Sequence, residues 1–155
     1  MPKTATFKTS KGDIVVELFE KETPKTIANF EKLTAKGFYN NLKFHRVIPD
    51  FMVQGGCPEG TGRGGPGYQT ECEIVPAIRH QKGSLAMAHA GTCKHDRKTG
   101  AKLQGACSNG SQFYITHKAT DWLDGVHTVF GQVKTGQDIV DKIAQGDKLL
   151  EIKIQ

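Results

Sequence analysis

Residues 44–56 read FHRVIPDFMVQGG and place one permanent cation, Arg46, inside an apolar run. Because a guanidinium keeps its charge in a protein, Arg46 must either reach water or serve a function. A Pro-Asp pair in the middle of the stretch is typical of a turn between two short strands, which would bring Arg46, Phe51 and Gln54 onto one surface. An edge strand whose arginine points outward explains Arg46 alone equally well.

The composition of the chain indicates a single globular domain, residues 1–155. It is 37% hydrophobic, contains 18 glycines and has no apolar run of membrane-spanning length, so no membrane association is expected. The net charge is +5, but the basic residues are scattered among acidic ones without a basic stripe, which argues against nucleic-acid binding. The first residues contain no stretch of signal-peptide length, so the expected compartment is the cytoplasm.

Alternating apolar residues and turn signals predict a chain made mostly of strands. One helix is predicted to begin at a Thr23 cap, with Pro24 in its first turn, and to end at Gly37; a second covers 139–144. Because strands and helices do not alternate regularly, these elements favour a mainly antiparallel barrel or sandwich. The predicted strands are residues 4–9, 14–19, 44–47, 51–54, 68–74, 84–88, 112–116, 128–133 and 150–154.

The segment after Gln54 is rich in glycine and is expected to be a loop. Its glycines at 60, 62 and 65 satisfy GxGxxG, but no strand precedes them and no helix follows, so dinucleotide binding is rejected. The sequence also contains no HExxH, GxSxG or Walker motif. Metalloprotease, serine hydrolase and nucleotide hydrolase chemistry are therefore not expected.

Five segments, taken together, resemble the cyclophilins, the cyclosporin-binding peptidyl-prolyl cis-trans isomerases. The chain resembles a short, prokaryotic-like form of that family with an insertion at about 92–108. The resemblance implies a closed eight-stranded antiparallel β-barrel with a helix over each open end and an active site in an outer groove. Besides FHRVIPDFMVQGG, the segments are the opening strand pair up to ETPKTIANF (22–30), GSLAMAHAG (83–91), NGSQFYIT (109–116) and WLDGVHTVFG (122–131).

Prolyl isomerisation suits these residues because no bond has to be cut. The barrier of ~18–20 kcal/mol arises from amide resonance, so catalysis needs a pocket for the proline ring and a donor that favours the twisted amide. An immobile arginine beside an apolar pocket meets this demand. The expected function is cofactor-free isomerisation of exposed X-Pro bonds, with folding-helper activity; the alternative is a non-catalytic module or chaperone that only binds proline peptides.

The resemblance also assigns roles to individual positions. Arg46 would donate to the prolyl amide, and Gln54 would orient it. Tyr114 stands where the family usually has Phe, which would add a hydroxyl at the pocket rim, and His89 replaces the usual Asn. The catalytic set is Arg46, Gln54 and His127, and the substrate-binding set is Phe51, Met52, Ala88, His89, Tyr114, Trp122 and Leu123. Trp122 implies binding of cyclosporin-type inhibitors, and a monomer is expected.

The insertion, TCKHDRKTGAKLQGACS at 92–108, is expected to be a polar surface loop beside the groove that tunes substrate access. Two alternatives remain: a zinc site, or a reversible disulfide between Cys93 and Cys107 that regulates activity. The candidate zinc ligands are Cys93, His95 and Cys107, completed by Cys57 or His89. Because no CxxC pair is present, free thiols are the default for all four cysteines, and His45 and His80 are read as ordinary histidines.

Overall fold

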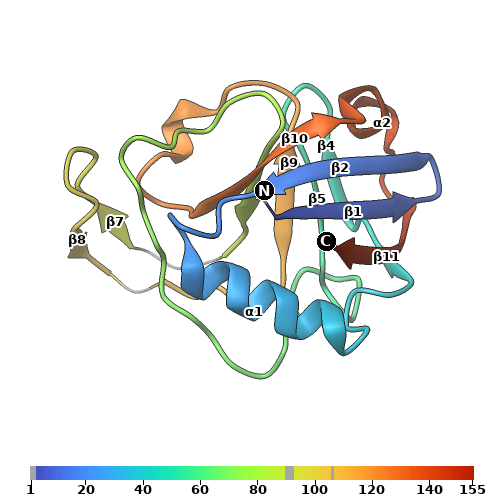
Figure 1. Cartoon of the computed structure of the whole chain (residues 1–155), viewed down its shortest axis with the longest axis horizontal. Coiled ribbons are helices and arrows are strands. Elements are labelled where there is room, and N and C mark those ends of the chain that lie inside the picture. Colours follow the sequence, from blue (N-terminus) through green and yellow to red (C-terminus); the bar gives the residue numbers. More distant parts are fainter. Residues whose placement is uncertain (1–2, 90–92, 106) are drawn as a thin grey trace.

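The computed structural model describes residues 3–89, 93–105 and 107–155. Its main element is a curled antiparallel sheet of nine strands in the order β3-β11-β1-β2-β10-β6-β9-β5-β4 (Figure 1). The strands are β1 (Thr4–Thr9), β2 (Gly12–Leu18), β3 (Leu42–Lys43), β4 (Arg46–Ile48), β5 (Met52–Gly55), β6 (Ser84–Met87), β9 (Phe113–Thr116), β10 (Val129–Thr135) and β11 (Lys148–Ile154). Within the described ranges, no helix has the length and apolar character needed to cross a membrane.

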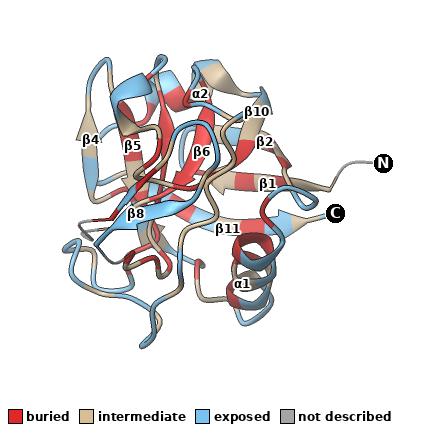
Figure 2. Ribbon diagram, turned by 90° about the vertical axis from the view of Figure 1, so that its left-hand side faces the viewer, coloured by how far each residue is buried: buried red, intermediate tan, exposed pale blue. Residues whose placement is uncertain are grey.

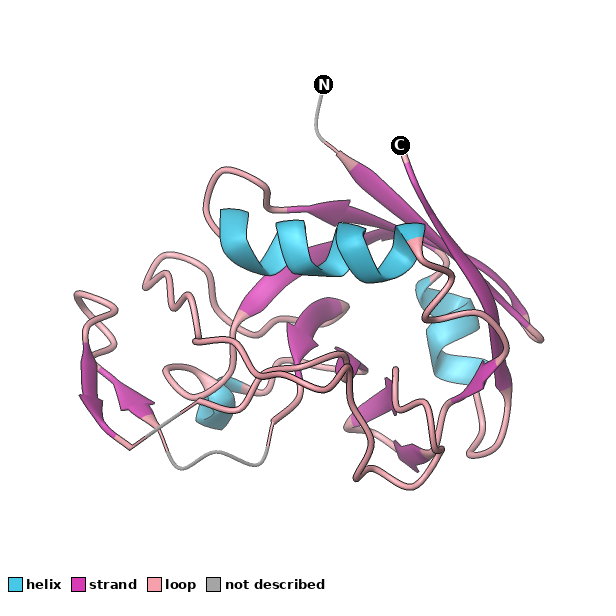
Figure 3. Cartoon of the chain, turned by 90° about the horizontal axis from the view of Figure 1, so that it is seen from below, coloured by secondary structure: helices cyan, strands magenta, loops and turns pink. Residues whose placement is uncertain are grey.

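Two helices pack against this sheet. Helix α1 (Pro24–Ala35) buries Ile27, Phe30 and Leu33 and contacts β11, whereas α2 (Gln137–Lys142) buries Val140 and contacts β2. Figure 3 shows both helices lying on the concave side of the strand layer. The helical spacing of the apolar residues in α1 therefore produces the one-sided burial that the sequence predicted.

The main core consists of aromatic and aliphatic side chains enclosed by the curled sheet and α1. Phe30 packs against Phe7, Tyr39 and Phe130 with ring centroids 5.3–6.0 Å apart. All four residues are at most 1% exposed, and the buried segments of the ribbon face inward in Figure 2. Burying each such side chain stabilises the fold by roughly 1.5–3 kcal/mol.

The turn in the opening stretch forms as predicted. Phe51 N–H donates to the Ile48 carbonyl at 3.1 Å, and Asp50 takes a positive φ of 60°. β4 and β5 then pair so that Arg46 lies opposite Gln54. The stretch ends at Gly56, where φ is +88° and an added Cβ would lie 2.5 Å from the Ser111 carbonyl oxygen, so only glycine fits without a shift.

The expected closed barrel of eight strands is met only in part, because the structure shows a curled sheet of nine. Its two edge strands are β3 and β4, and no ladder joins them among the pairings of the described residues. Only residues 44 and 45 separate these strands along the chain, so the two edges must approach each other there. Phe44 N–H instead donates to the Asp147 carbonyl at 2.8 Å.

The N-terminus of α1 is capped differently from the prediction. The Thr23 hydroxyl donates to the Phe19 carbonyl at 2.8 Å and makes no capping bond. The Glu73 carboxylate accepts hydrogen bonds from the N–H groups of Lys25 at 3.2 Å and Thr26 at 2.6 Å. A carboxylate at this end also complements the helix dipole. The predicted Thr23 side-chain cap is therefore wrong, because a residue distant in sequence takes its place.

Two further segments differ from the sequence prediction. Residues 68–74 form no strand, and Thr70 makes only an isolated bridge with Asn109. Their polar groups bond to loops and to α1, as Glu73 does, so strand propensity is overridden by tertiary contacts. The insertion forms a hairpin of β7 (Lys94–His95) and β8 (Lys102–Gln104) that projects from the main sheet (Figures 1 and 3). Of the insertion, positions 92 and 106 lie outside the described residues.

Candidate active site

A groove with a volume of about 1210 Å³ lies over one face of β5 and β9. Side chains on a strand alternate between its two faces, and here one face carries the main core while the other carries a second apolar cluster. On β9, Phe113 and Ile115 belong to the main core, whereas Tyr114 belongs to the second cluster. The second cluster lies beneath the groove.

Nine of the ten predicted site residues line this groove. They are Arg46, Phe51, Met52, Gln54, Ala88, His89, Tyr114, Leu123 and His127. Trp122 does not line it, is 54% exposed and lies beside it, with its ring 5.7 Å from that of Phe51. The short helix η1 (Asp121–Leu123) therefore carries Leu123 into the groove and Trp122 onto its outer edge.

Arg46 is exposed at the groove, and its side chain makes no hydrogen bond or ion pair with another described residue. Its strand partner Gln54 donates instead to the Gln112 side-chain oxygen at 3.0 Å. Gln112 in turn donates to the carbonyls of Gly62 and Gly64, both at 2.9 Å. Gln112 thus joins Gln54 to the glycine-rich loop, a role that sequence reasoning missed although Gln112 lies two residues before Tyr114 on the same face.

The glycine-rich loop itself forms one wall of the groove, through residues 61–69. The sequence predicted a loop here but assigned it no part in the site. The high glycine content of the loop could have indicated a part in the site, because glycine-rich backbone can approach a ligand closely.

The floor of the groove is apolar. Met52, Ala86, Tyr114 and Val129 are buried together, and Phe51 and Leu123 are among the partly buried side chains packed against them. Such a surface can hold the ring of a proline, which has no polar group on its ring carbons.

The Tyr114 hydroxyl is buried and does not lie at the rim, which corrects the sequence expectation. Tyr114 is 4% exposed, and its hydroxyl lies 2.7 Å from His80 Nε2. His80 Nδ1 lies 2.7 Å from the Asp124 carboxylate, so Nδ1–H donates to Asp124 and the tyrosine donates to Nε2. Burial lowers the pKa of His80 despite this carboxylate, so the imidazole is neutral at pH 7. No motif in the sequence pointed to this relay.

His127 presents a neutral imidazole to the groove. Its Nδ1–H donates to the Met87 carbonyl at 3.0 Å. Its ring is nearly perpendicular to that of Tyr114, with the two ring centroids 5.6 Å apart. Burial, followed by the neighbouring His89, lowers the pKa of His127 to about 4. At neutral pH this residue therefore adds no charge to the proline pocket.

Ala88 and His89 follow β6 at the other wall. The N–H of Ala88 donates to the Gln112 carbonyl at 3.0 Å. His89 Nε2 donates to the Val126 carbonyl at 2.6 Å, and the imidazole also lies 4.5 Å from that of His127. His89 thus lies between the groove and the residues behind this wall, such as Val126.

Two groups of described side chains could hold a metal ion behind this wall: Cys72, His89 and Cys93, and Cys72, His95 and Cys107. Cys72 was not among the ligands predicted from the sequence. Cys57, which was, lies elsewhere, and its sulfur accepts hydrogen bonds from the N–H groups of Gly62 and Gly64. Burial raises the pKa of Cys72 and raises that of Cys93 to about 11.

Comparison with known proteins identifies the family. Residues 4–155 match the family model described as cyclophilin type peptidyl-prolyl cis-trans isomerase/CLD. The chain is 48% identical over 152 residues to a peptidyl-prolyl cis-trans isomerase of Synechococcus elongatus, covering 97% of this chain and 94% of that protein. It is 45% identical over 155 residues to peptidyl-prolyl cis-trans isomerase B of Bacillus subtilis, covering 99% of each.

Solved structures agree with this assignment. The crystal structure of a Cryptosporidium parvum cyclophilin type peptidyl-prolyl cis-trans isomerase has a TM-score of 0.86 and 30% identity and covers 100% of this chain and 98% of its own. A second structure of that protein, in the presence of the dipeptide Ala-Pro, has a TM-score of 0.84. The chain belongs to the cyclophilin-type peptidyl-prolyl cis-trans isomerases. Its activity is the cis-trans isomerisation of X-Pro peptide bonds.

Proposed function

We propose that Arg46 catalyses isomerisation by donating a hydrogen bond to the nitrogen of the twisted prolyl amide, while the apolar floor of the groove holds the proline ring. The observation that supports this most directly is the position of Arg46. It is the exposed cation of β4, it lies opposite Gln54, and it borders the same groove as Met52 and Leu123. A donor in this position lies beside the pocket proposed for the proline ring, and therefore beside the prolyl amide.

The chemistry follows from the loss of amide resonance during rotation. As the C–N bond twists, the nitrogen becomes pyramidal and gains a lone pair that can accept a hydrogen bond, whereas the planar ground state has none to offer. A donor at that position therefore binds the transition state more strongly than either planar isomer. Arginine suits the role because its guanidinium stays charged and rigid.

The substrate would be an exposed X-Pro segment of a peptide or folding protein. The Cryptosporidium parvum structure in the presence of Ala-Pro supports proline-containing ligands for this groove. The carbonyl of Ala88 is the wall group that could accept from the substrate backbone, because its N–H is already bonded. Catalysis would require no cofactor, since rotation involves neither electron nor group transfer.

The remaining expectations are proposals of the same kind. We expect the protein to act as a monomer in the cytoplasm, where its four cysteines would stay reduced, and to bind cyclosporin-type inhibitors in the groove. The curled sheet would complete a barrel where its edge strands β3 and β4 meet, since only two residues link them.

Replacing the arginine tests the mechanism. Arg46→Ala should lower kcat/KM for an X-Pro peptide at least ~100-fold, equivalent to roughly 3 kcal/mol of transition-state stabilisation, with little change in unfolding free energy. NMR exchange or a protease-coupled assay gives the rate. Arg79→Ala, which removes an exposed arginine outside the groove, should be fully active. Full activity of Arg46→Ala would exclude Arg46 as the catalytic donor, and unchanged peptide affinity without turnover would confirm that the variant still binds.

A further inference from the structure

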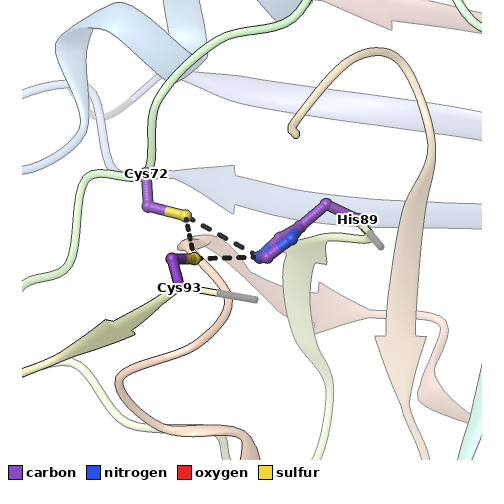
Figure 4. Close-up of side chains that lie close together, drawn as sticks. All are labelled: Cys72, His89 and Cys93. Carbon is purple, nitrogen blue, oxygen red and sulfur yellow. Dashed lines mark hydrogen bonds between the residues drawn. The ribbon is translucent and has the colours of Figure 1, made fainter. Parts of the chain in front are cut away.

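Four potential metal ligands converge behind the groove from different parts of the chain. Cys72 comes from the long loop between β5 and β6, and His89 follows β6. Cys93 precedes β7, and Cys107 follows β8, so these two stand at the base of the hairpin. Cys93 and Cys107 are 1% and 6% exposed. Figure 4 shows the side chains of Cys72, His89 and Cys93 pointing toward a common centre.

The spacing of three ligand atoms is that of a tetrahedral zinc site. The two sulfurs of Cys72 and Cys93 are 3.7 Å apart, and each lies 3.8 Å from His89 Nε2. With Zn–S of about 2.3 Å and Zn–N of about 2.0 Å, a tetrahedron requires about 3.8 Å between two sulfurs and about 3.5 Å between sulfur and nitrogen. The three atoms thus already form one face of such a tetrahedron.

Cys107 is placed to provide the fourth ligand. Its sulfur lies 2.9 Å from that of Cys93 and within 4.8 Å of that of Cys72, so the Cys93 and Cys107 sulfurs would have to move apart by about 0.9 Å to reach the spacing of about 3.8 Å. His95 lies near Cys72 and Cys107 as well, and its Nδ1–H donates to the Gly125 carbonyl at 2.9 Å. A histidine that binds metal through one ring nitrogen commonly makes such a bond with the other, so His95 is a second imidazole of this region that could bind the ion.

We propose that Cys72, His89, Cys93 and Cys107 bind one zinc ion and that the metal fastens the β7–β8 hairpin to the wall of the groove. Three thiolates and one imidazole are ligands that zinc prefers, and hard oxygen-seeking cations such as Mg²⁺ are disfavoured by such a set. On binding, the three thiols release their protons to solvent. The Nε2 of His89 releases the proton that it donates to the Val126 carbonyl and binds the metal, while Nδ1 takes up a proton from solvent, so the imidazole stays neutral.

The site would couple metal to the groove through His89. This residue lines the groove, and its ring contacts that of His127 at 4.5 Å. Without metal, the hairpin shares no ladder with the main sheet among the described strands, and its contacts include the bonds of His95 to the Gly125 carbonyl and an ion pair between Lys102 and Glu71. With zinc, Cys93 and Cys107 would be bonded through one ion to Cys72 and His89, which closes the loop between them. Metal binding itself does not depend on the proposed catalytic mechanism, because it is measured without substrate.

Metal uptake by the full chain tests the proposal directly. The protein is reduced with a phosphine, freed of metal with a chelator and titrated with Zn²⁺ and, separately, with Co²⁺. We expect one Zn²⁺ per chain, and for Co²⁺ the intense visible bands of a tetrahedral site with a thiolate charge-transfer band in the near ultraviolet. Cys72→Ser and Cys107→Ser should each weaken Zn²⁺ binding at least roughly 100-fold. Cys57→Ser is the matched control and should bind like the parent protein, because Cys57 is buried outside the cluster.

A second measurement reports on the hairpin. Arg97, Lys98 and Lys102 are exposed on it, so trypsin cleavage within 97–102, followed by mass spectrometry, measures how firmly it is held. Zinc should slow this cleavage in the parent and in Cys57→Ser and leave it unchanged in Cys72→Ser. Circular dichroism shows whether each variant is folded. The proposal is overturned if the reduced, folded protein takes up no Zn²⁺, if Cys72→Ser binds as tightly as the parent, or if only a Cys93–Cys107 disulfide is found and its reduction restores no metal binding.

Discussion

The two faces of strands β5, β6, β9 and β10 carry different kinds of side chains, although residues of the two faces alternate along each strand. The inner face contributes hydrocarbon to a closed core, with Phe113 and Ile115 0% exposed. The outer face contributes Met52 and Tyr114 to a smaller cluster that is open to the groove. Each cluster contains one buried tyrosine hydroxyl: in the main core that of Tyr39 donates to the Ser111 carbonyl, whereas in the outer cluster that of Tyr114 is bonded to a titratable side chain, His80.

This difference indicates that stability and activity depend on alternate residues of the same strands. The inner face can be filled by any side chains that pack well, because nothing but the rest of the core contacts it. The outer face must keep an open surface for a ligand and must satisfy its polar groups internally. Variants of the two faces should therefore separate unfolding free energy from catalytic rate.

The largest effect on stability is expected at the inner face. Phe113→Ala should lower the unfolding free energy by about 3–5 kcal/mol, because it removes a fully buried ring that packs against Phe7 and Tyr39. Leu123→Ala, which removes a half-buried side chain of η1 that packs on the outer cluster, should cost less stability while lowering kcat/KM more. Urea unfolding and peptide isomerisation measure the two quantities. Equal losses of stability in both variants would contradict the separation of the faces.

A smaller effect is expected from acid, through the buried relay of the outer face. Burial lowers the pKa of folded His80, which faces the Asp124 carboxylate and the Tyr114 hydroxyl, whereas the unfolded chain keeps the ordinary value of about 6.5. Below that pH the unfolded state binds more protons, so the stability present above pH 6.5 is lost as pH falls through the folded pKa, by at most about 1.4 kcal/mol per pH unit for this group.

Urea unfolding at pH 7, 6 and 5, with chelator present, measures the slope. The His80→Gln variant should show a shallower decline than the parent because it lacks the titrating group. An identical decline in both proteins would mean that other groups cause the acid sensitivity.

The smallest effect on stability is expected at the outer edge of the groove. Trp122→Ala should change the unfolding free energy by no more than about 0.5 kcal/mol, because this side chain is 54% exposed. If cyclosporin binds as proposed, its affinity should fall roughly tenfold, since exposed aromatic side chains commonly anchor ligands. Calorimetry gives the affinity. Unchanged binding by the variant would place the inhibitor away from Trp122.

The sequence alone determined the features that arise from local pattern and short connections. The alternation in β1 and β2, the apolar face of α1 and the turn that sets Arg46 opposite Gln54 all follow from residues close together in the chain. The ordered motifs were enough to identify the family and nine of the residues that line the groove, whereas Gln112 and the wall at 61–69 were missed.

Only the tertiary structure decided the contacts between distant segments. Glu73 caps α1, His80 satisfies Tyr114, and Cys72 joins the cysteines of the insertion. Each of these contacts is made by a residue in an irregular loop, where side-chain positions depend on the elements against which the loop packs and no periodicity records them. The same reason explains why residues 68–74 were taken for a strand: their backbone conformation is set by bonds to α1 and to Asn109, and not by their own propensity.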